Sequence, residues 1–298
     1  MKNTKTGLIF GVSAYVLWGL FPLYWPLLEP AGALEIVGHR AVWSLVFCVI
    51  ALTITKAIKP ALATMRRPKV FVKLLAATLL VSINWVVYIW ATNNGHVVEA
   101  SLGYYINPII MIAIGIILLK EKMRKLQWAS VSIAALGVLV LTIDYGRLPW
   151  IALALALSWG SYGLVKKQLN LGALEGLAIE TLLSLPFYGG YLIYIGLNGT
   201  GQLGSSLGLS LLLIGAGVVT AIPLLLFNGS TTRLPFTIIG LLQYITPTIQ
   251  FSIGVWVRHE DMPTARWVGF MIIWAALITL AIDLIKSGRT VNNSVTQG

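Results

Sequence analysis

One carboxylate begins a long apolar stretch, in the sequence EASLGYYINP that runs from Glu99 to Pro108. Steps of about one and two helical turns from Glu99 reach Gly103 and Asn107, so these residues share one face of a helix. An ionisable group inside a membrane is costly and usually faces the bundle interior or water. There it can bind a cationic group or carry a proton. The alternative is an interfacial carboxylate at the helix start, where the helix dipole favours negative charge.

A histidine and an arginine are adjacent near the start of another apolar stretch, at His39 and Arg40. Histidine titrates near neutral pH, which suits a proton relay. Arg40 could pair with Glu35 or Glu99. For both residues we favour a fixed ion pair, or a charged head group that reaches the membrane surface. Glu99 and His39 remain the two candidates for proton coupling.

Three other carboxylates have simpler interpretations. Glu180 lies near the inner end of its apolar stretch, and Lys166 and Lys167 end the stretch before it, so we expect an ion pair. Glu121 and Glu260 lie at the ends of apolar stretches among basic residues. We interpret these two as anchors rather than as ligands.

Amide and aromatic side chains within the apolar stretches are candidates for the wall of a substrate pathway. Aromatic walls with a few directed polar groups suit a small amphiphilic molecule. For the tryptophans the alternative is the aromatic belt at the membrane surface. With Glu99, the candidate pathway residues are Trp18, Asn84, Trp85, Tyr88, Tyr105, Asn107, Trp159, Asn228, Gln243 and Tyr244.

Two prolines, Pro108 and Pro247, lie inside apolar stretches. Proline removes a backbone donor and clashes with the preceding turn, so we expect a kink at each. Carbonyls freed by a kink are tolerated where they line a cavity or meet neighbouring helices. We therefore expect the helices around both prolines to line the pathway. The alternative is that the prolines only shape helix packing.

Membrane-spanning helices must position these residues. The 298-residue chain is 57% hydrophobic and 10% charged, whereas soluble domains carry about 25% charged residues. A spanning helix needs about 20 apolar residues, and continuous apolar runs indicate helices rather than the alternating strands of a barrel. Ten segments qualify: 7–27, 36–55, 71–91, 97–119, 126–143, 149–166, 174–196, 207–228, 234–256 and 264–285.

Basic residues set the orientation of these segments. With the N-terminus inside, 17 of the 21 Lys and Arg residues fall on the inner side. Cytoplasmic loops collect Lys and Arg, so the asymmetry predicts that both termini lie inside. Basic residues at helix ends also contact anionic lipid headgroups. The +11 net charge therefore indicates a lipid bilayer as partner and not a nucleic acid.

The second half of the chain repeats features of the first half. Alignment of Pro108 with Pro247, an offset of 139, also pairs Tyr105 with Tyr244, Ile110 with Ile249 and Glu121 with Glu260. Trp18-Gly19 matches Trp159-Gly160 at an offset of 141. A duplicated unit of five helices enters the membrane from opposite sides, which gives inverted repeats. Such repeats are typical of secondary transporters, whose substrate sites lie near the midplane between the repeats.

Other classes of membrane protein lack support in the sequence. It contains no H-E-x-x-H zinc motif and no P-loop. We therefore expect no enzyme, no metal and no cofactor. A channel usually needs a selectivity-filter segment or an oligomeric ring, and an uncoupled facilitator or channel is the alternative that we retain. The oligomeric state is not predicted.

Three blocks of sequence resemble the RarD family of bacterial permeases, which belongs to the EamA-type branch of the drug/metabolite transporter superfamily. These blocks are EIVGHRAVWS (35–44), NWVVYIWATNNGHVVEASLGYYINP (84–108) and IETLLSLP (179–186). The resemblance covers about residues 5–287. It implies a multi-pass inner-membrane transporter of ten helices, made of two EamA units. RarD proteins are commonly labelled chloramphenicol-sensitivity or chloramphenicol-resistance permeases, and related branches export amino acids and other metabolites.

The prediction is an all-α membrane protein with inverted five-helix repeats at 5–143 and 149–286 and a polar tail at 287–298. We expect it to export a small organic metabolite or drug by alternating access, driven by a gradient of protons or of the substrate.

Overall fold

The computed structural model is built of helices, and it contains no strand among the residues that it describes. These are residues 2–93, 97–145 and 150–257, with 264, 267–269, 271–272, 274–276, 278–280 and 282–283. The helices are α1 (Lys2–Gly19), α2 (Phe21–Tyr24), η1 (Trp25–Leu28), α3 (Ala33–Ile54), α4 (Ile58–Met65), α5 (Pro68–Asn93), α6 (Val97–Ile117), α7 (Lys125–Tyr145), α8 (Trp150–Leu169), α9 (Ala173–Leu197), α10 (Leu207–Thr231), α11 (Phe236–Leu242) and α12 (Ile245–Trp256).

Five of the described spans are long and apolar enough to cross a membrane: Thr4–Leu28, Ala33–Ile54, Pro68–Tyr88, Ala173–Leu197 and Leu207–Thr231. Shorter apolar helices occupy Gly103–Ile117, Lys125–Val140 and Trp267–Leu280. Two features of the structure contribute to the difference between these five spans and the ten predicted segments. Lysines lie inside the last turn of α8, and the predicted segment 234–256 is divided between α11 and α12.

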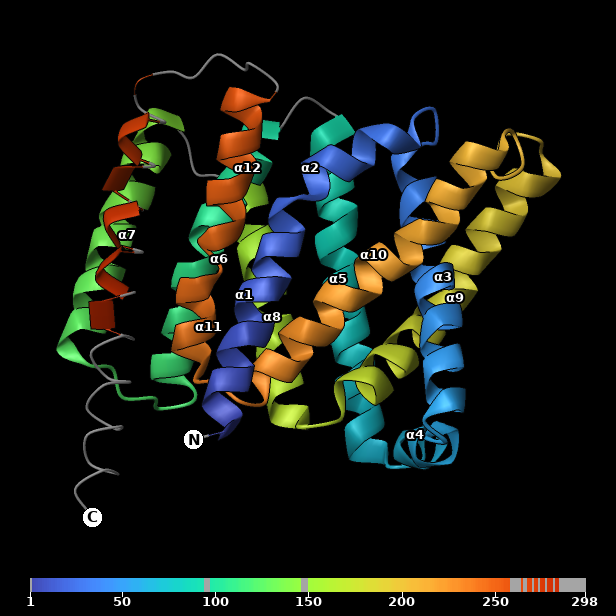
Figure 1. The fold of residues 1–298 in the computed structure, drawn as a ribbon, viewed down its shortest axis with the longest axis horizontal. Helices are drawn as coiled ribbons and strands as arrows, with labels where there is room; N and C mark the ends of the chain where they lie inside the picture. Colours follow the sequence, from blue (N-terminus) through green and yellow to red (C-terminus); the bar gives the residue numbers. More distant parts are fainter. Residues whose placement is uncertain are drawn as a thin grey trace.

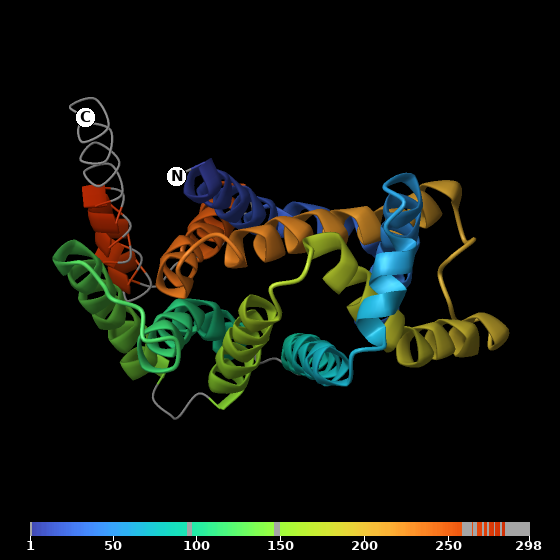
Figure 2. The ribbon, with the colours of Figure 1, turned by 90° about the horizontal axis from the view of Figure 1, so that it is seen from below.

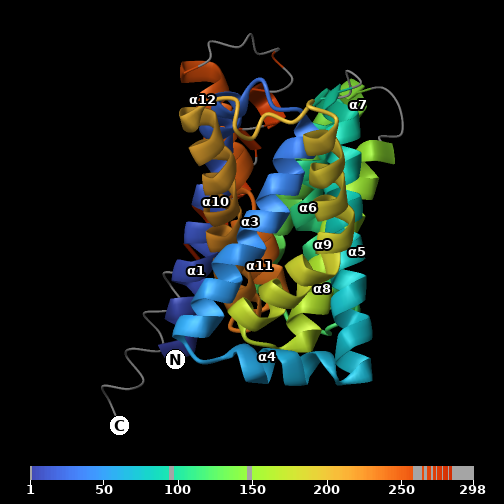
Figure 3. The same ribbon diagram turned by 90° about the vertical axis from the view of Figure 1, so that its right-hand side faces the viewer.

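The helices form two rows when the molecule is viewed along them (Figure 2). One row holds α1 and α10 with α11, and the other holds α5, α6 and α8. The closest helix pairs are α6 with α8, α3 with α9 and α10, α5 with α8 and α9, α1 with α10 and α12, and α6 with α11. The start of α1 and the short helix α4 lie at one end of the molecule, and α2 lies at the other (Figure 1, Figure 3). We call these the N-terminal end and the opposite end.

The two prolines affect their helices differently. α6 continues as a helix through Pro108. The helix around Pro247 is interrupted earlier, because α11 ends at Leu242 and α12 begins at Ile245. A proline cannot donate to the carbonyl four residues before it, and Gln243 occupies that position. The interruption therefore falls one turn before the proline.

Contacts at the N-terminal end join the first half of the chain to the second. The Glu121 carboxylate accepts hydrogen bonds from the backbone N–H groups of Phe236 (2.7 Å) and Thr237 (3.0 Å) at the start of α11. It also lies 3.6 Å from the Lys167 ammonium, which donates to the Leu234 carbonyl at 2.7 Å. We call this group the Glu121 clasp. Glu121 is thus an anchor, as the sequence predicts.

Two further ion pairs lie at the N-terminal end of the described structure. Lys166 and Glu180 form the ion pair that the sequence predicts, with both side chains 5% exposed. Tyr162 donates its hydroxyl to the same carboxylate at 3.1 Å. Arg124 at the start of α7 pairs with Asp283. These pairs stabilise helix contacts at the N-terminal end.

Candidate functional site

A cavity of about 150 Å³ lies among helices from both halves of the chain. Its wall combines aromatic rings, amides and a single charged side chain among the described residues. The lining residues are Tyr15, Trp18, Phe21, Pro22, Trp25, Arg40, Asn84, Trp85, Tyr88, Tyr104, Asn107, Trp159, Gln243, Thr246, Pro247 and Gln250. The cavity therefore brings together seven of the predicted pathway residues and one of the predicted prolines: Trp18, Asn84, Trp85, Tyr88, Asn107, Trp159, Gln243 and Pro247.

Other predicted pathway residues lie away from this cavity. Tyr105 and Tyr244 are buried together in a packed cluster. Asn228 is 3% exposed within α10 and does not line the cavity. Glu99 lies in α6, but its side chain is outside the described part of the structure. Gly103 faces α8, because a Cβ built on it would lie 3.2 Å from the Ala152 Cα.

Tyr104 is one of several lining residues that the sequence prediction missed, and Tyr15, Trp25, Arg40 and Gln250 are others. In α6, Tyr104 lines the cavity, whereas its neighbour Tyr105 lies in a packed cluster. Tyr104 lies three positions before Asn107 and therefore shares its face. Helical spacing from Asn107 was the signal that could have identified it.

Aromatic rings pack between the two halves at the bottom of the cavity. The Trp18 and Trp159 ring centroids are 5.3 Å apart in an edge-to-face arrangement. Phe227 contacts both, at centroid distances of 5.6 Å and 5.4 Å. Phe227 lies about one turn before the end of α10. The rings therefore connect the cavity wall to the last turns of α10, and the Glu121 clasp lies at the N-terminal end of the molecule.

Four lining residues carry buried polar atoms without a hydrogen-bond partner among the described residues. These atoms are the Tyr15 hydroxyl, Asn107 Oδ1, Trp159 Nε1 and Gln243 Oε1. A buried polar group left unpaired is unfavourable, and such groups normally find water or a ligand. All four belong to residues of the cavity wall, although the atoms themselves are buried in the structure as it stands.

Other amides and hydroxyls of the wall hold the helices together. Asn84 Nδ2 donates to the Leu155 carbonyl (2.9 Å) and to the Ser158 hydroxyl (3.0 Å), which joins α5 to α8. The Thr246 hydroxyl donates to the Tyr15 carbonyl at 2.8 Å and joins α12 to α1. The wall is therefore built on side chains that bridge neighbouring helices.

Arg40 is the charged side chain of the wall. Its Nε donates to the Thr220 hydroxyl at 2.9 Å. Its Cζ lies 4.8 Å from the Trp25 ring centroid and 4.9 Å from that of Trp85. These are cation–π distances. No carboxylate of the described residues lies within 4.0 Å of its guanidinium.

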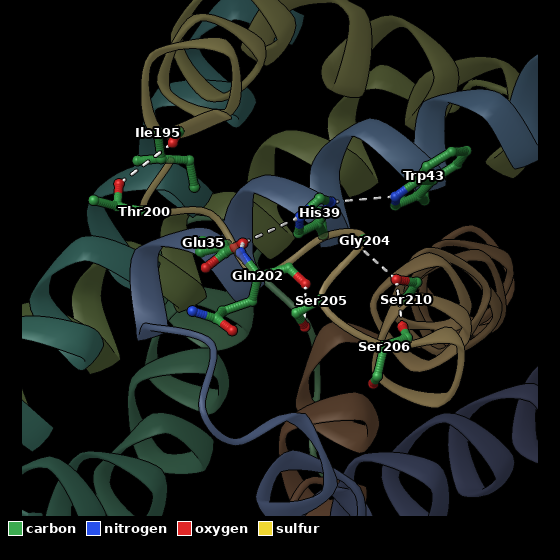
Figure 4. A network of polar contacts seen from close by, with 10 residues as sticks. All are labelled: Glu35, His39, Trp43, Ile195, Thr200, Gln202, Gly204, Ser205, Ser206 and Ser210. Atoms are coloured by element: carbon green, nitrogen blue, oxygen red, sulfur yellow. Dashed lines mark hydrogen bonds and ion pairs between the residues drawn. The ribbon is translucent and has the colours of Figure 1, made fainter. Parts of the chain in front are cut away.

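The predicted pair between Arg40 and Glu35 is not formed, because Glu35 belongs to a separate network (Figure 4). The Glu35 carboxylate lies 3.7 Å from His39 Nε2, one helical turn away, and accepts the Gln202 N–H at 2.6 Å. Trp43 Nε1 donates to His39 Nδ1 at 3.3 Å. This network joins α3 to the loop between α9 and α10. His39 is 3% exposed and does not line the cavity.

The described residues hold no group of three or more His, Cys, Asp or Glu side chains that could bind a metal ion. The chemistry of the cavity is therefore that of aromatic rings, amides, hydroxyls and one guanidinium. Such a wall can bind a small organic molecule. These features define a helical membrane protein with a binding cavity between its halves.

Comparison with known proteins gives the family. Residues 5–143 match the EamA-like transporter family. The protein RarD of Streptomyces exfoliatus is 47% identical to this chain, over 97% of this chain and 92% of the relative. The uncharacterized transporter YojE of Bacillus subtilis (strain 168) is 45% identical, over 96% of this chain and 97% of the relative. The chain belongs to the RarD family of EamA-like transporters, as its sequence blocks indicate.

A solved structure has the same fold. It superposes with a TM-score of 0.72 at 16% identity and covers 92% of this chain and 96% of its own. Family membership makes the protein a membrane transporter and not an enzyme. It is a multi-pass protein of the bacterial inner membrane whose environment is lipid and whose cargo is a small molecule.

Proposed function

We propose that the protein is a secondary transporter that moves a small organic metabolite or drug out of the cell by alternating access. The cavity between the two halves is its substrate site. This shared cavity is the observation that carries the proposal, because both halves contribute to its wall: Trp18 and Asn107 from the first, Trp159 and Gln243 from the second. A relative movement of the halves changes which side of the membrane the cavity faces.

We further propose ten spans in two inverted repeats, 5–143 and 149–286, followed by a polar tail at 287–298. The pairing of the helices supports this arrangement. Exchange of the halves turns α1 into α8, α3 into α9, α5 into α10 and α6 into α11–α12. The pair α6–α8 then becomes α12–α1, α5–α8 becomes α10–α1, and α5–α9 becomes α10–α3. Every exchanged pair is also a close pair of the structure.

Two glycine contacts give further support to the repeat. A Cβ built on Gly19 would lie 2.7 Å from the Ile249 side chain, and one built on Gly160 would lie 2.9 Å from that of Ile110. The sequence repeat pairs Gly19 with Gly160 and Ile249 with Ile110. Each half therefore packs a glycine against the repeat-related isoleucine of the other half.

The proposed orientation has both termini in the cytoplasm. Lys59, Arg66 and Lys69 on and beside α4 lie at the N-terminal end of the molecule, with the α1 start (Figure 3). Cytoplasmic loops collect such residues. In this orientation the end with the Glu121 clasp faces the cytoplasm, and we propose that the clasp closes that end while the cavity is reached from outside.

For energy coupling we propose protons. Of the two predicted coupling residues, His39 lies outside the cavity wall, so Glu99 is the candidate that we retain. The alternative is an uncoupled facilitator, in which Glu99 is an interfacial carboxylate at the start of α6.

Counterflow in proteoliposomes tests the proposed function. A panel of labelled amino acids, nucleosides and chloramphenicol is screened with a pH-sensitive dye present. We expect saturable counterflow of at least one compound by the wild type, loss of it in Gln243→Leu, and retention in the lipid-facing control Trp128→Phe, whose side chain is 51% exposed. Loss of proton flux alone in Glu99→Gln supports coupling. Transport without proton flux in either protein supports the facilitator.

A further inference from the structure

We propose that the cavity selects small aromatic monoanions, with a carboxylate on the Arg40 guanidinium and a single ring against the aromatic wall. This inference rests on the proposed function, because it names the substrate class of the same cavity.

The geometry of Arg40 supports this inference. The rings of Trp25 and Trp85 lie 4.8 Å and 4.9 Å from its Cζ, and only its Nε is bonded to a described acceptor, Thr220. The two terminal amino groups therefore remain as donors at the edge of the guanidinium. That edge matches a carboxylate through two parallel hydrogen bonds.

The charge of the cavity wall also supports this inference. Arg40 lies about two turns into α3, within an apolar helix that is long enough to span the membrane. An unpaired charge at that depth is costly. The rest of the described wall consists of aromatic, amide, hydroxyl and proline side chains, all neutral. An anion that arrives with the substrate supplies the counter-charge that the described residues do not provide, whereas a cation is repelled.

The size of the cavity also supports this inference. A cavity of about 150 Å³ is comparable to cavities in proteins that take up benzene, roughly 150 Å³. Trp18, Trp159 and Tyr15 offer ring faces and edges to an aromatic guest. The amide and hydroxyl groups of the wall can bind a polar substituent on that ring. A one-ring carboxylate thus satisfies the volume, the charge and the wall together.

The test compares three probes that share one ring and differ in charge: benzoate, benzamide and benzylammonium. Binding to the full chain in nanodiscs is measured by calorimetry at pH 7.5. We expect benzoate to bind about tenfold or more tightly than benzamide, as for a hydrogen bond to a charged group. Benzylammonium should bind most weakly.

Variants then assign the charge to its residue. Arg40→Gln should weaken benzoate by about tenfold or more and leave benzamide unchanged, which also shows that the variant is folded. Arg40→Lys should retain part of the preference, because it keeps the charge and loses the paired geometry. The exposed Arg66 provides the matched control, Arg66→Gln, with wild-type binding. In Glu99→Gln, benzoate should bind at least as tightly as in wild type, since no protein carboxylate is needed to hold it.

Equal or tighter binding of benzamide or benzylammonium would overturn the proposal, as would undiminished benzoate binding in Arg40→Gln. A loss in Glu99→Gln as large as that in Arg40→Gln would overturn the role of Arg40 as the charged anchor. Counterflow separates this inference from the proposed function. If a neutral or cationic compound is transported and benzoate does not bind, the substrate class fails and transport stands. If benzoate binds through Arg40 and nothing in the panel is transported, the substrate class stands and the proposed transport function fails.

Discussion

The Glu121 clasp should hold the protein in the conformation that is closed at its cytoplasmic end. Glu121 accepts two backbone hydrogen bonds from α11 and faces Lys167 at 3.6 Å. Glu121→Gln keeps one acceptor oxygen for the backbone and loses the negative charge. A hydrogen bond to a charged group contributes about 1.5–3 kcal/mol. The side chains of Glu121 and Lys167 are 14% and 23% exposed, and solvent screening places the loss near the lower part of that range.

A loss of about 2 kcal/mol changes the ratio of two conformations roughly 30-fold, provided that the clasp exists in only one of them. Spin labels report this ratio through the distance between the halves. Lys122 and Thr232 are exposed residues near the Glu121 clasp, one in each half, and Cys48 is the single cysteine. The labelled protein is therefore Lys122→Cys/Thr232→Cys in a Cys48→Ser background.

We expect a short distance in the wild type and a second, longer population in Glu121→Gln. Glu29 is an exposed carboxylate at the opposite end, and Glu29→Gln serves as the control without effect. An unchanged distance distribution in Glu121→Gln, with only a lower melting temperature, would refute the reasoning and leave Glu121 as a static anchor.

Three further predictions concern buried contacts. Glu180→Gln leaves Lys166 as a buried, unpaired charge and should destabilise the protein by about 3–5 kcal/mol. Thermal unfolding in detergent should show this loss of stability. The double variant Glu180→Gln/Lys166→Met should recover part of the lost stability. His39→Gln should lower the melting temperature by loosening the loop at Gln202 and leave the pH profile of transport unchanged, whereas a flattened profile would give His39 the coupling role. Gly160→Val should abolish transport, because its Cβ would lie 2.9 Å from Ile110 Cγ2; wild-type counterflow in that variant would contradict the packing described here.

The general position of the site could be predicted because polar residues are conspicuous in apolar helices. Asn84, Asn107 and Gln243 were identified on that basis, and all three line the cavity. The choice between Tyr104 and Tyr105 depends on the rotation of α6, which only the helical spacing from Asn107 indicates in the sequence. Tyr104 lines the cavity, and Tyr105 packs against α7 and α8.

It was harder to predict which residue a charged side chain pairs with than to predict that the charged side chain is buried. The pair of Lys166 with Glu180 follows from two helix ends that meet on one side of the membrane. Arg40 was expected to pair with Glu35 or Glu99. Glu35 bonds to a loop that lies 167 positions away in the sequence, and the Glu99 side chain is outside the described part of the structure. Sequence spacing within one helix cannot reveal such a competitor. The free edge of Arg40 is consequently a property of the tertiary structure.

Alternating access at the cavity is the central claim, and labelling of the cavity from both sides of the membrane tests it most directly. Gln250 lines the cavity, so Gln250→Cys in the Cys48→Ser background is exposed to a membrane-impermeant thiol reagent in right-side-out and in inside-out vesicles. The account predicts labelling in both, with faster labelling of inside-out vesicles when Glu121→Gln is added. Labelling from the outer side alone, unchanged by Glu121→Gln, would contradict alternating access.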